Sequence, residues 1–179
     1  MNIIYRKAVL QDVDQLEQLI GISARSINSS YYTKDEINAA LGNAWTVDQQ
    51  LILDNTYWVA ENTRGDLVGC GGWSKRKLLF GKNKNPDFTQ KELNPGKDSA
   101  RIRAFFVHPD YTRKGIGRRL LQLCESEAKS NGFTSTELLA TLSGEKLYSS
   151  CGYVALTSYE VDLGRGITNQ VISMHKSLE

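Results

Sequence analysis

The chain has 179 residues, of which 40% are hydrophobic and 23% charged, so its composition is that of a folded globular protein and excludes a disordered or fibrous one. The 22 lysines and arginines and the 20 acidic residues leave a formal net charge of +2, which does not favour bulk binding to nucleic acid. The sequence has 3 scattered cysteines, 2 histidines and no apolar stretch long enough for a signal peptide or a membrane helix, so we expect one cytoplasmic domain over residues 1–179 with no metal site and no membrane partner.

The N-terminal part of the sequence predicts one strand followed by two helices. Ile3–Lys7 is typical of a short strand, and apolar residues at helical spacing then begin after Asp12, which we expect to cap the first helix. Thr33–Leu41 is predicted as a second helix because its first residue and Glu36 have the spacing of a capping box. The polar and aromatic segment Ser29–Tyr32 between the two helices either covers the edge of a core or lines a pocket.

A β-hairpin is predicted next. Tyr57–Glu61 and Leu67–Trp73 are two apolar runs separated by a polar turn that contains glycine. Because Gly69, Gly71 and Gly72 weaken the second strand, they suggest a bulge or the close approach of another backbone.

The segment Leu78–Lys97 is rich in proline, asparagine and lysine and is typical of an exposed loop between two strands. Positive charges gather just before it at Lys75–Lys77 and within it at Lys82 and Lys84. These charges either form a solvated face or attract an anionic ligand.

The C-terminal half alternates strands and helices. Ala100–Val107 is predicted as a strand in which Ile102, Ala104 and Phe106 face one side. The elements expected after it are a helix from Ile116 that ends at Asn131-Gly132, a strand at Thr134–Leu139, a helix at Gly144–Ser150, and a strand pair at Tyr153–Leu163 and Thr168–Ser177. This order predicts a mixed α/β (α+β) fold, with a mixed sheet and helices on its faces.

A glycine turn at the start of the predicted helix is the segment with the clearest chemistry. Gly115 and Gly117 lack a Cβ, so an anion can approach the backbone closely, and the unpaired N–H groups of a helix N-terminus favour phosphate. The turn matches neither known phosphate motif: no Lys-Ser or Lys-Thr follows the second glycine, and Leu120 occupies the last glycine position of the dinucleotide fingerprint. Taken alone, the pattern is compatible with a phosphate site or an ordinary tight turn.

Two motifs together resemble the GNAT N-acetyltransferase superfamily. The run Phe105-Phe106-Val107-His108-Pro109, followed five residues later by Gly115-Ile116-Gly117 and then by Leu120-Leu121, is similar to the acetyl-CoA signature of that family. The later run Leu147-Tyr148-Ser149-Ser150-Cys151-Gly152-Tyr153 is similar to its second motif, a helix that carries tyrosine and closes in Gly-Phe or Gly-Tyr. The resemblance, which covers nearly the whole chain, implies a mostly antiparallel mixed sheet with helices on both faces and two splayed strands that hold acetyl-CoA.

The resemblance also implies roles for single residues. The backbone that pairs with the pantetheine arm would come from Phe105, Phe106 and Val107, and the amides that hold the pyrophosphate from Arg113, Lys114, Gly115, Ile116, Gly117 and Arg118. Thr141 stands where many relatives carry an asparagine that contacts the cofactor. Tyr148 resembles the general acid that protonates the leaving CoA thiolate, and its plainer interpretation is a core tyrosine with a satisfied hydroxyl.

The implied reaction is transfer of acetyl from acetyl-CoA to a primary amine of a small molecule or peptide, by direct attack in a ternary complex. The protein would be a monomer or a homodimer, because the terminal strand pair is able to exchange between subunits. The alternative is a non-catalytic acyl-CoA-binding or sensing module of the same fold, and a nucleic-acid module is disfavoured by the near-neutral charge.

Two departures from the family pattern bear on this choice. The first position of the glycine signature is Thr112 rather than glutamine or arginine, with the basic residue one place later. The strand before the turn carries no glutamate, which leaves Glu61, His108 or a water chain as candidates for the general base. Arg101 and Arg103 alternate with apolar residues there, and if they line the acceptor cleft they favour an acceptor with a carboxylate or phosphate.

Overall fold

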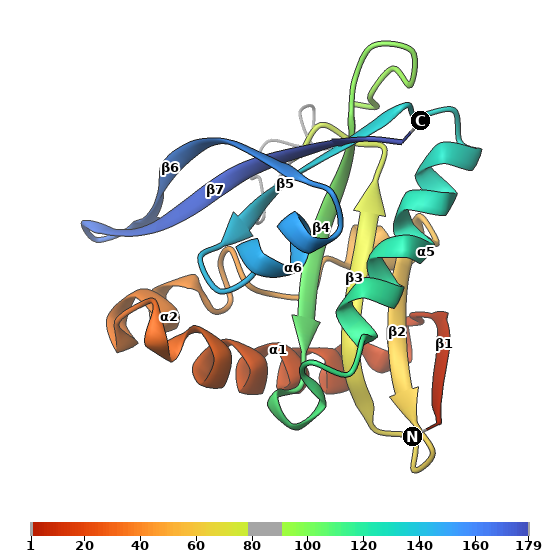
Figure 1. Ribbon diagram of the computed structural model, residues 1–179. Coiled ribbons are helices and arrows are strands. Elements are labelled where there is room, and N and C mark those ends of the chain that lie inside the picture. Colours follow the sequence, from red (N-terminus) through yellow and green to blue (C-terminus); the bar gives the residue numbers. More distant parts are fainter. Residues whose placement is uncertain (1, 79–90, 179) are drawn as a thin grey trace.

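One seven-stranded sheet organises the described part of the chain, residues 2–78 and 91–178 of a computed structural model (Figure 1). The strands lie in the order β1-β2-β3-β4-β5-β7-β6, and all neighbours are antiparallel except β4 and β5, which are parallel. Their bounds are β1 Ile3–Lys7, β2 Tyr57–Asn62, β3 Leu67–Ser74, β4 Ala100–Val107, β5 Ser135–Thr141, β6 Val154–Gly164 and β7 Ile167–Ser177. The predicted mixed and mostly antiparallel sheet is therefore confirmed.

Helices cover both faces of this sheet (Figure 1). Their bounds are α1 Val13–Ile27, α2 Lys34–Ala40, α3 Gln49–Leu53, α5 Ile116–Ser130 and α6 Glu145–Ser150, with short 3-10 helices η1 Leu10–Asp12, η2 Asn28–Ser30 and η3 Pro109–Tyr111. All of the predicted helices are present. The sequence did not lead us to expect α3, because it is only 5 residues long and too short for a periodic pattern.

The core is divided by the sheet into two layers. On one face Leu16 and Ile20 of α1 pack with Val59 of β2, and we call this the α1 face. On the other face Leu120 of α5 packs with Ala60, the neighbour of Val59 on β2, and we call this the α5 face. Successive residues of a strand point to opposite faces, so side chains of the sheet are assigned to one layer or the other.

The two helix caps predicted from sequence have different outcomes. Before α2, the Glu36 amide donates to Thr33 Oγ1 and the Thr33 amide donates to Glu36 Oε2, so the capping box is confirmed. Asp12 precedes α1, but its side chain makes no cap hydrogen bond to that helix. Its carboxylate instead accepts from the Val9 amide and from the guanidinium of Arg6, because a full positive charge is the stronger partner.

A β-bulge in the middle of β4 overturns one sequence prediction. Cys70 pairs with Phe106 and Gly72 with Arg103, so two residues of β4 stand opposite Gly71 alone. One of these two, Ala104, has a left-handed φ of 55°. The bulge resets the alternation of the strand, so the prediction that Ile102, Ala104 and Phe106 face one side is wrong: Ile102 packs on the α5 face, whereas Ala104 and Phe106 pack on the α1 face.

Side chains, rather than another backbone, occupy the space beside two glycines of β3. A Cβ on Gly71 would lie 2.6 Å from ring atoms of Phe105, and a Cβ on Gly69 would lie 2.7 Å from Ile116 Cγ2. A bulge does lie beside these glycines, but its extra residue belongs to the partner strand β4, opposite Gly71. The close neighbours of Gly69 and Gly71 are the first residue of α5 and a phenyl ring.

The predicted long loop lies mostly outside the described residues, since Lys82 and Lys84 fall within residues 79–90. The flanks that are described come together, because Arg76 and Glu92 form an antiparallel bridge. Among the helices of residues 2–78 and 91–178, none has the length and apolar character needed to cross a membrane.

Candidate active site

The sheet splits between its two parallel strands. Within the described residues, β4 and β5 pair at two positions, Ala100 with Thr136 and Arg101 with Glu137, and then diverge. In Figure 1 the two strands spread apart below this point, with α6 beside the opening. The edge of β4 that faces β5 is therefore left without a strand partner over Phe105 to Val107 in this part of the chain.

A cavity of about 1000 Å³ occupies this split and reaches both faces of the sheet. We call the part lined by η3, the glycine turn, the start of α5 and α6 the cofactor arm. We call the part on the α1 face, lined by α1, residues 44–50 and the β6–β7 hairpin, the acceptor arm. Residues predicted from sequence to form the site line the cavity as follows: Phe105, Phe106, Val107, Arg113, Gly115, Ile116, Gly117, Arg118, Thr141 and Tyr148.

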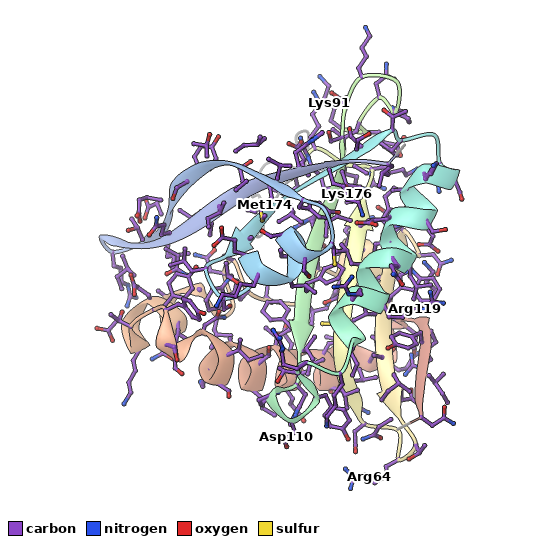
Figure 2. All side chains as sticks on the ribbon, viewed as in Figure 1. Arg64, Lys91, Asp110, Arg119, Met174 and Lys176 are labelled. Atoms are coloured by element: carbon purple, nitrogen blue, oxygen red, sulfur yellow. The ribbon has the colours of Figure 1, made fainter. Side chains whose placement is uncertain are left out.

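The turn before α5 presents a row of free backbone donors. The N–H groups of Arg113 through Arg118 have no hydrogen-bond acceptor among the described residues. Arg113 and Gly115 have left-handed φ values of 60° and 83°, so successive amides of this turn form a concave nest of the kind that binds anions. Asp110 and Arg119, labelled in Figure 2, flank this segment in sequence on η3 and on α5.

Basic side chains add charge around this nest. Arg113, Arg118 and Lys146 line the cavity, and Arg118 donates to Ser150 Oγ at 3.3 Å. Lys114 does not belong to the described lining: its ammonium donates to the Asp110 carbonyl at 2.6 Å and lies over the ring of Tyr111. If Lys114 contributes to anion binding, it therefore does so through its backbone amide.

Thr112 shows why the departure in the glycine signature leaves the nest intact. Its hydroxyl donates to the Pro109 carbonyl at 2.9 Å, within η3. The side chain at this position therefore closes the turn instead of reaching the nest, and the backbone donors do not depend on it.

Tyr148 lies on α6 at the wall of the cavity. Its side chain is 8% exposed, and its ring makes edge contacts with Phe105 and Tyr153 at centroid distances of 6.2 and 5.7 Å. Its hydroxyl makes no hydrogen bond to any described residue. Burial raises the pKa of Tyr148, with smaller contributions from Cys124 and Cys151, so the phenol stays protonated at neutral pH.

These features coincide with a family match. Residues 54–155 of the 179 match the sequence profile described as the acetyltransferase (GNAT) domain. The chain belongs to the GNAT acetyltransferase family. It is an acyltransferase on this ground, and no curated protein sequence matches it significantly.

Solved GNAT structures share the fold at low identity. The GCN5-related N-acetyltransferase from Rhodopseudomonas palustris has 20% identity and a TM-score of 0.72 over 99% of this chain and 96% of that one. PaiA N-acetyltransferase from Thermoplasma acidophilum, in complex with coenzyme A, has 17% identity and a TM-score of 0.65 over 99% of both chains. YncA from Salmonella typhimurium, with its cofactor acetyl-CoA, has 16% identity and a TM-score of 0.63 over 100% of this chain and 95% of that one.

The two side chains expected as general bases of this GNAT protein, Glu61 and His108, do not line the cavity. Glu61 is bound by the guanidinium of Arg6 at 2.7 Å, on the far side of the sheet order from β5. His108 accepts from the Asp110 amide at 3.3 Å and packs against Tyr111. Neither side chain is part of the described cavity lining.

The two arginines of β4 also differ from the sequence expectation. Arg101 pairs with Glu137 of β5 and is absent from the described lining, so it does not line an acceptor cleft. Arg103 does line the cavity, but its Nη1 lies 2.5 Å from Asp48 Oδ2. Burial lowers the pKa of Arg103, and the Asp48 carboxylate opposes this effect, so the pair largely cancels its own charge.

Sequence reasoning missed the polar residues of the acceptor arm, among them Glu17, Asp48 and Asn169. These three come from α1, from the segment before α3 and from β7, so they share no local motif. Glu17 stands on the polar side of an amphipathic helix, where a glutamate is ordinarily solvated, and Asn169 sits within a strand that favours apolar residues. The asparagine within a predicted strand was therefore the one signal in the sequence that could have pointed to this arm.

In residues 2–78 and 91–178, no three histidine, cysteine or acidic side chains lie close enough to hold a metal ion.

Proposed function

We propose that this GNAT protein transfers the acetyl group of acetyl-CoA to a primary amine by direct attack in a ternary complex. The observation that carries the proposal is the row of free N–H groups from Arg113 to Arg118 in the same cavity as the unpaired hydroxyl of Tyr148. The N–H groups are suited to bind a diphosphate, and the hydroxyl is suited to protonate a leaving thiolate. The sheet takes in strands from both ends of the described chain, which supports a single domain.

In this proposal the cofactor arm holds CoA along its length. The amides of Arg113 to Arg118 bind the pyrophosphate, helped by the positive charges of Arg118 and Lys146. The free edge of β4 from Phe105 to Val107 pairs with the amides of the pantetheine arm as an additional strand would. Thr141 lines the cavity at the end of β5 and would contact the same arm from there, with its hydroxyl also accepting from the Gly144 amide at 3.2 Å. PaiA with coenzyme A and YncA with acetyl-CoA, which share the fold, support this placement.

The transfer itself needs a neutral amine and an acid for the sulfur. The amine nitrogen attacks the thioester carbonyl carbon, a C–N bond forms, and the C–S bond then breaks. Tyr148 gives its hydroxyl proton to the departing thiolate, and the attacking nitrogen gives up its own proton to solvent or to a carboxylate of the acceptor arm. Because burial raises the pKa of Tyr148, the hydroxyl enters each cycle protonated.

A non-catalytic acyl-CoA-binding module remains the second candidate, and one observation favours it. Neither Glu61 nor His108 belongs to the described lining of the cavity, so neither of the two side chains expected from sequence as the base lies at the cavity wall. The acceptor arm does contain Glu17, whose Oε1 accepts from Thr46 and Val47 and whose Oε2 has no donor among the described residues. This carboxylate keeps a proton acceptor in the cavity and makes turnover the better proposal.

Two measurements test the proposal together. Calorimetry with CoA should give saturable binding at one site per chain. Release of free thiol from acetyl-CoA should then depend on added amine across a panel of polyamines, amino acids, amino-acid amides and aminoglycosides, with the N-acetyl product identified by mass. Binding of CoA with no amine-dependent thiol release would support the sensing module, and absence of CoA binding would refute both.

A further inference from the structure

Asn28 is a buried residue that keeps a free hydrogen-bond donor. It lies in η2, directly after α1, and is 4% exposed. Its Nδ2 makes no hydrogen bond with any described residue, yet this atom is not sealed in the core and retains some accessible surface. Because Asn28 lines the cavity, that surface opens into it. An amide donor in a buried side chain is costly to leave unpaired, so its partner belongs to what fills the cavity.

The contacts of Asn28 show which end of its amide is free. Ser143 Oγ lies 2.5 Å from Asn28 Oδ1 and 3.0 Å from Thr141 Oγ1. A spacing of 2.5 Å fits an O–H···O bond and is too short for an N–H···O bond, so the oxygen of the amide faces the serine. Thr141 Oγ1 accepts from the Gly144 amide, which leaves its own proton to donate to Ser143, and Ser143 donates in turn to Asn28. Both N–H groups of Nδ2 therefore remain unused.

This chain of hydroxyl groups places Asn28 next to the proposed acid. Thr141 to Gly144 form the turn between β5 and α6, and α6 carries Tyr148. A Cβ on Gly144 would lie 3.1 Å from Thr141 Oγ1 and 3.3 Å from Tyr148 Cε2, a ring carbon beside the one that bears the hydroxyl. Asn28 thus continues the α1 wall of the acceptor arm up to the turn that precedes the acid.

Ser23 of α1 is a second buried residue with a free polar atom on this wall. It is 4% exposed and lines the cavity, and its Oγ makes no hydrogen bond with any described residue. A helical serine is able to bond back to the carbonyl four residues earlier, as Ser130 does, so the free Oγ of Ser23 is a difference between the two. The amide nitrogen of Asn28 only donates and the hydroxyl of Ser23 also donates, so this wall suits oxygen atoms of a ligand.

We infer that Asn28 is a specificity-determining residue that donates a hydrogen bond to an oxygen atom of the acceptor, so the acceptor is a primary amine that also carries a carboxylate, carbonyl or hydroxyl oxygen. The inference rests on the proposed function. A second ammonium group has only N–H donors and would leave Nδ2 unpaired. The attacking amine cannot be the partner either, because its lone pair is needed to form the C–N bond. Amino acids, amino-acid amides and amino alcohols share the required oxygen, whereas alkyl polyamines lack it.

Matched acceptors test the inference. At each chain length, the panel compares an alkylamine and a diamine with the amino alcohol, the amino acid and the amino-acid amide of the same carbon skeleton. We expect at least one oxygen-bearing acceptor to be acetylated with a kcat/KM about tenfold or more above both matched amines, because the analogue without the oxygen leaves the donor of Asn28 unpaired. The three oxygen-bearing forms then separate a carboxylate from a carbonyl and a hydroxyl.

Asn28→Asp isolates the free donor. The carboxylate keeps an oxygen for Ser143 and puts a second oxygen where Nδ2 stood. We expect the preference to disappear and the kcat/KM of the favoured acceptor to fall about tenfold or more, mainly through its KM, while calorimetry gives a Kd for CoA within about twofold of the wild type. Asn28→Ala replaces this variant if the aspartate folds poorly, and it should abolish the same preference.

Tyr32→Phe is the matched control, because it loosens the same turn without touching the cavity. The Tyr32 hydroxyl accepts from the Leu142 amide at 3.0 Å and donates to the Gln170 carbonyl at 2.6 Å, and Tyr32 is outside the described cavity lining. Its loss should change the rates with all acceptors by a similar factor and keep the preference for the oxygen-bearing form.

The outcomes distinguish the inference from the proposed function. Equal or better use of the matched amines by the wild type, or a preference that survives in Asn28→Asp, would overturn the inference and leave the acetyltransferase assignment standing. An equal loss with every acceptor in Asn28→Asp would also overturn it, since the amide would then serve the thioester oxygen or the turn. Absence of amine-dependent thiol release from every acceptor would refute the assignment first, and the inference with it.

Discussion

Replacing Tyr148 by phenylalanine isolates the step that the proposed mechanism assigns to its hydroxyl. The ring is buried between Phe105 and Tyr153, and phenylalanine keeps these edge contacts. The hydroxyl has no hydrogen bond to lose in the described structure, so we expect the free energy of unfolding to change by less than about 0.5 kcal/mol. The thiolate, however, loses its proton donor.

The size of the kinetic effect follows from that loss. A positioned acid contributes roughly 10²–10⁴-fold to a rate, which corresponds to about 3–5 kcal/mol of activation free energy. We therefore expect Tyr148→Phe to lower kcat at least about 100-fold with little change in the KM for either substrate. Because burial raises the pKa of Tyr148, the wild-type kcat should show no loss from its ionisation at any pH below about 10.

Tyr153→Phe is the matched control, and it should behave in the opposite way. Tyr153 is equally buried and touches Tyr148, but its hydroxyl is hydrogen-bonded to Thr136 Oγ1 at 2.8 Å, and it does not belong to the described cavity lining. Its loss should cost about 1 kcal/mol of stability and leave kcat within about twofold. Steady-state kinetics of thiol release and urea unfolding of both variants decide the matter. Equal kcat for Tyr148→Phe and the wild type would refute the acid role and favour the sensing module.

Three further perturbations test the packing, the ion pairs and the anion nest. Gly69→Ala would place a Cβ 2.7 Å from a methyl group of α5, so urea unfolding should show a loss of about 1–3 kcal/mol as the helix is pushed from the sheet. The hydrogen bond from Arg6 lowers the pKa of Asp12 in the folded state, so this pair stabilises the fold above the unfolded pKa near ~4 and the contribution is lost as the pH falls through the folded value. Urea titrations from pH 6 down should show a smaller acid loss for Asp12→Asn than for the wild type. Arg118→Ala should weaken CoA binding in calorimetry about five- to tenfold, most at low salt, whereas its neighbour Arg119, which lies outside the described lining, should tolerate the same change.

The cofactor side of the site could be predicted from sequence because its parts are contiguous. The strand, the turn and the helix that form the nest lie within Ala100–Ser130, and glycine at 115 is required by a left-handed φ of 83°. The second motif places Tyr148 on a short helix that the sequence also predicts. A local sequence pattern of this kind predicts both the backbone conformation of the turn and the N–H groups that the turn leaves free.

The acceptor side could not be predicted because its residues meet only in three dimensions. The alternation of Arg101 and Arg103 predicted that both would line the cleft, but it contained no information on their partners. Glu137 engages one at the last paired position of β4 and β5, and Asp48 reaches the other from a segment more than fifty residues earlier. Ion pairs between residues that are distant in sequence decide which charged side chains remain unpaired in a cavity. A single sequence does not show these pairs.

The bulge at Ala104 connects the two sides. Without it, Phe105 would share a face with Arg103, and Phe106 would share one with Ile102. The extra residue turns Phe105 to the α5 face, where its ring packs on Gly71 and meets Tyr148, while Phe106 packs on the α1 face beside the acceptor arm. The same irregularity accompanies the divergence of β4 from β5. One strained residue thus turns Phe105 toward the proposed acid and Phe106 toward the acceptor arm, so a segment whose sequence is typical of a regular strand contributes side chains to both parts of the site.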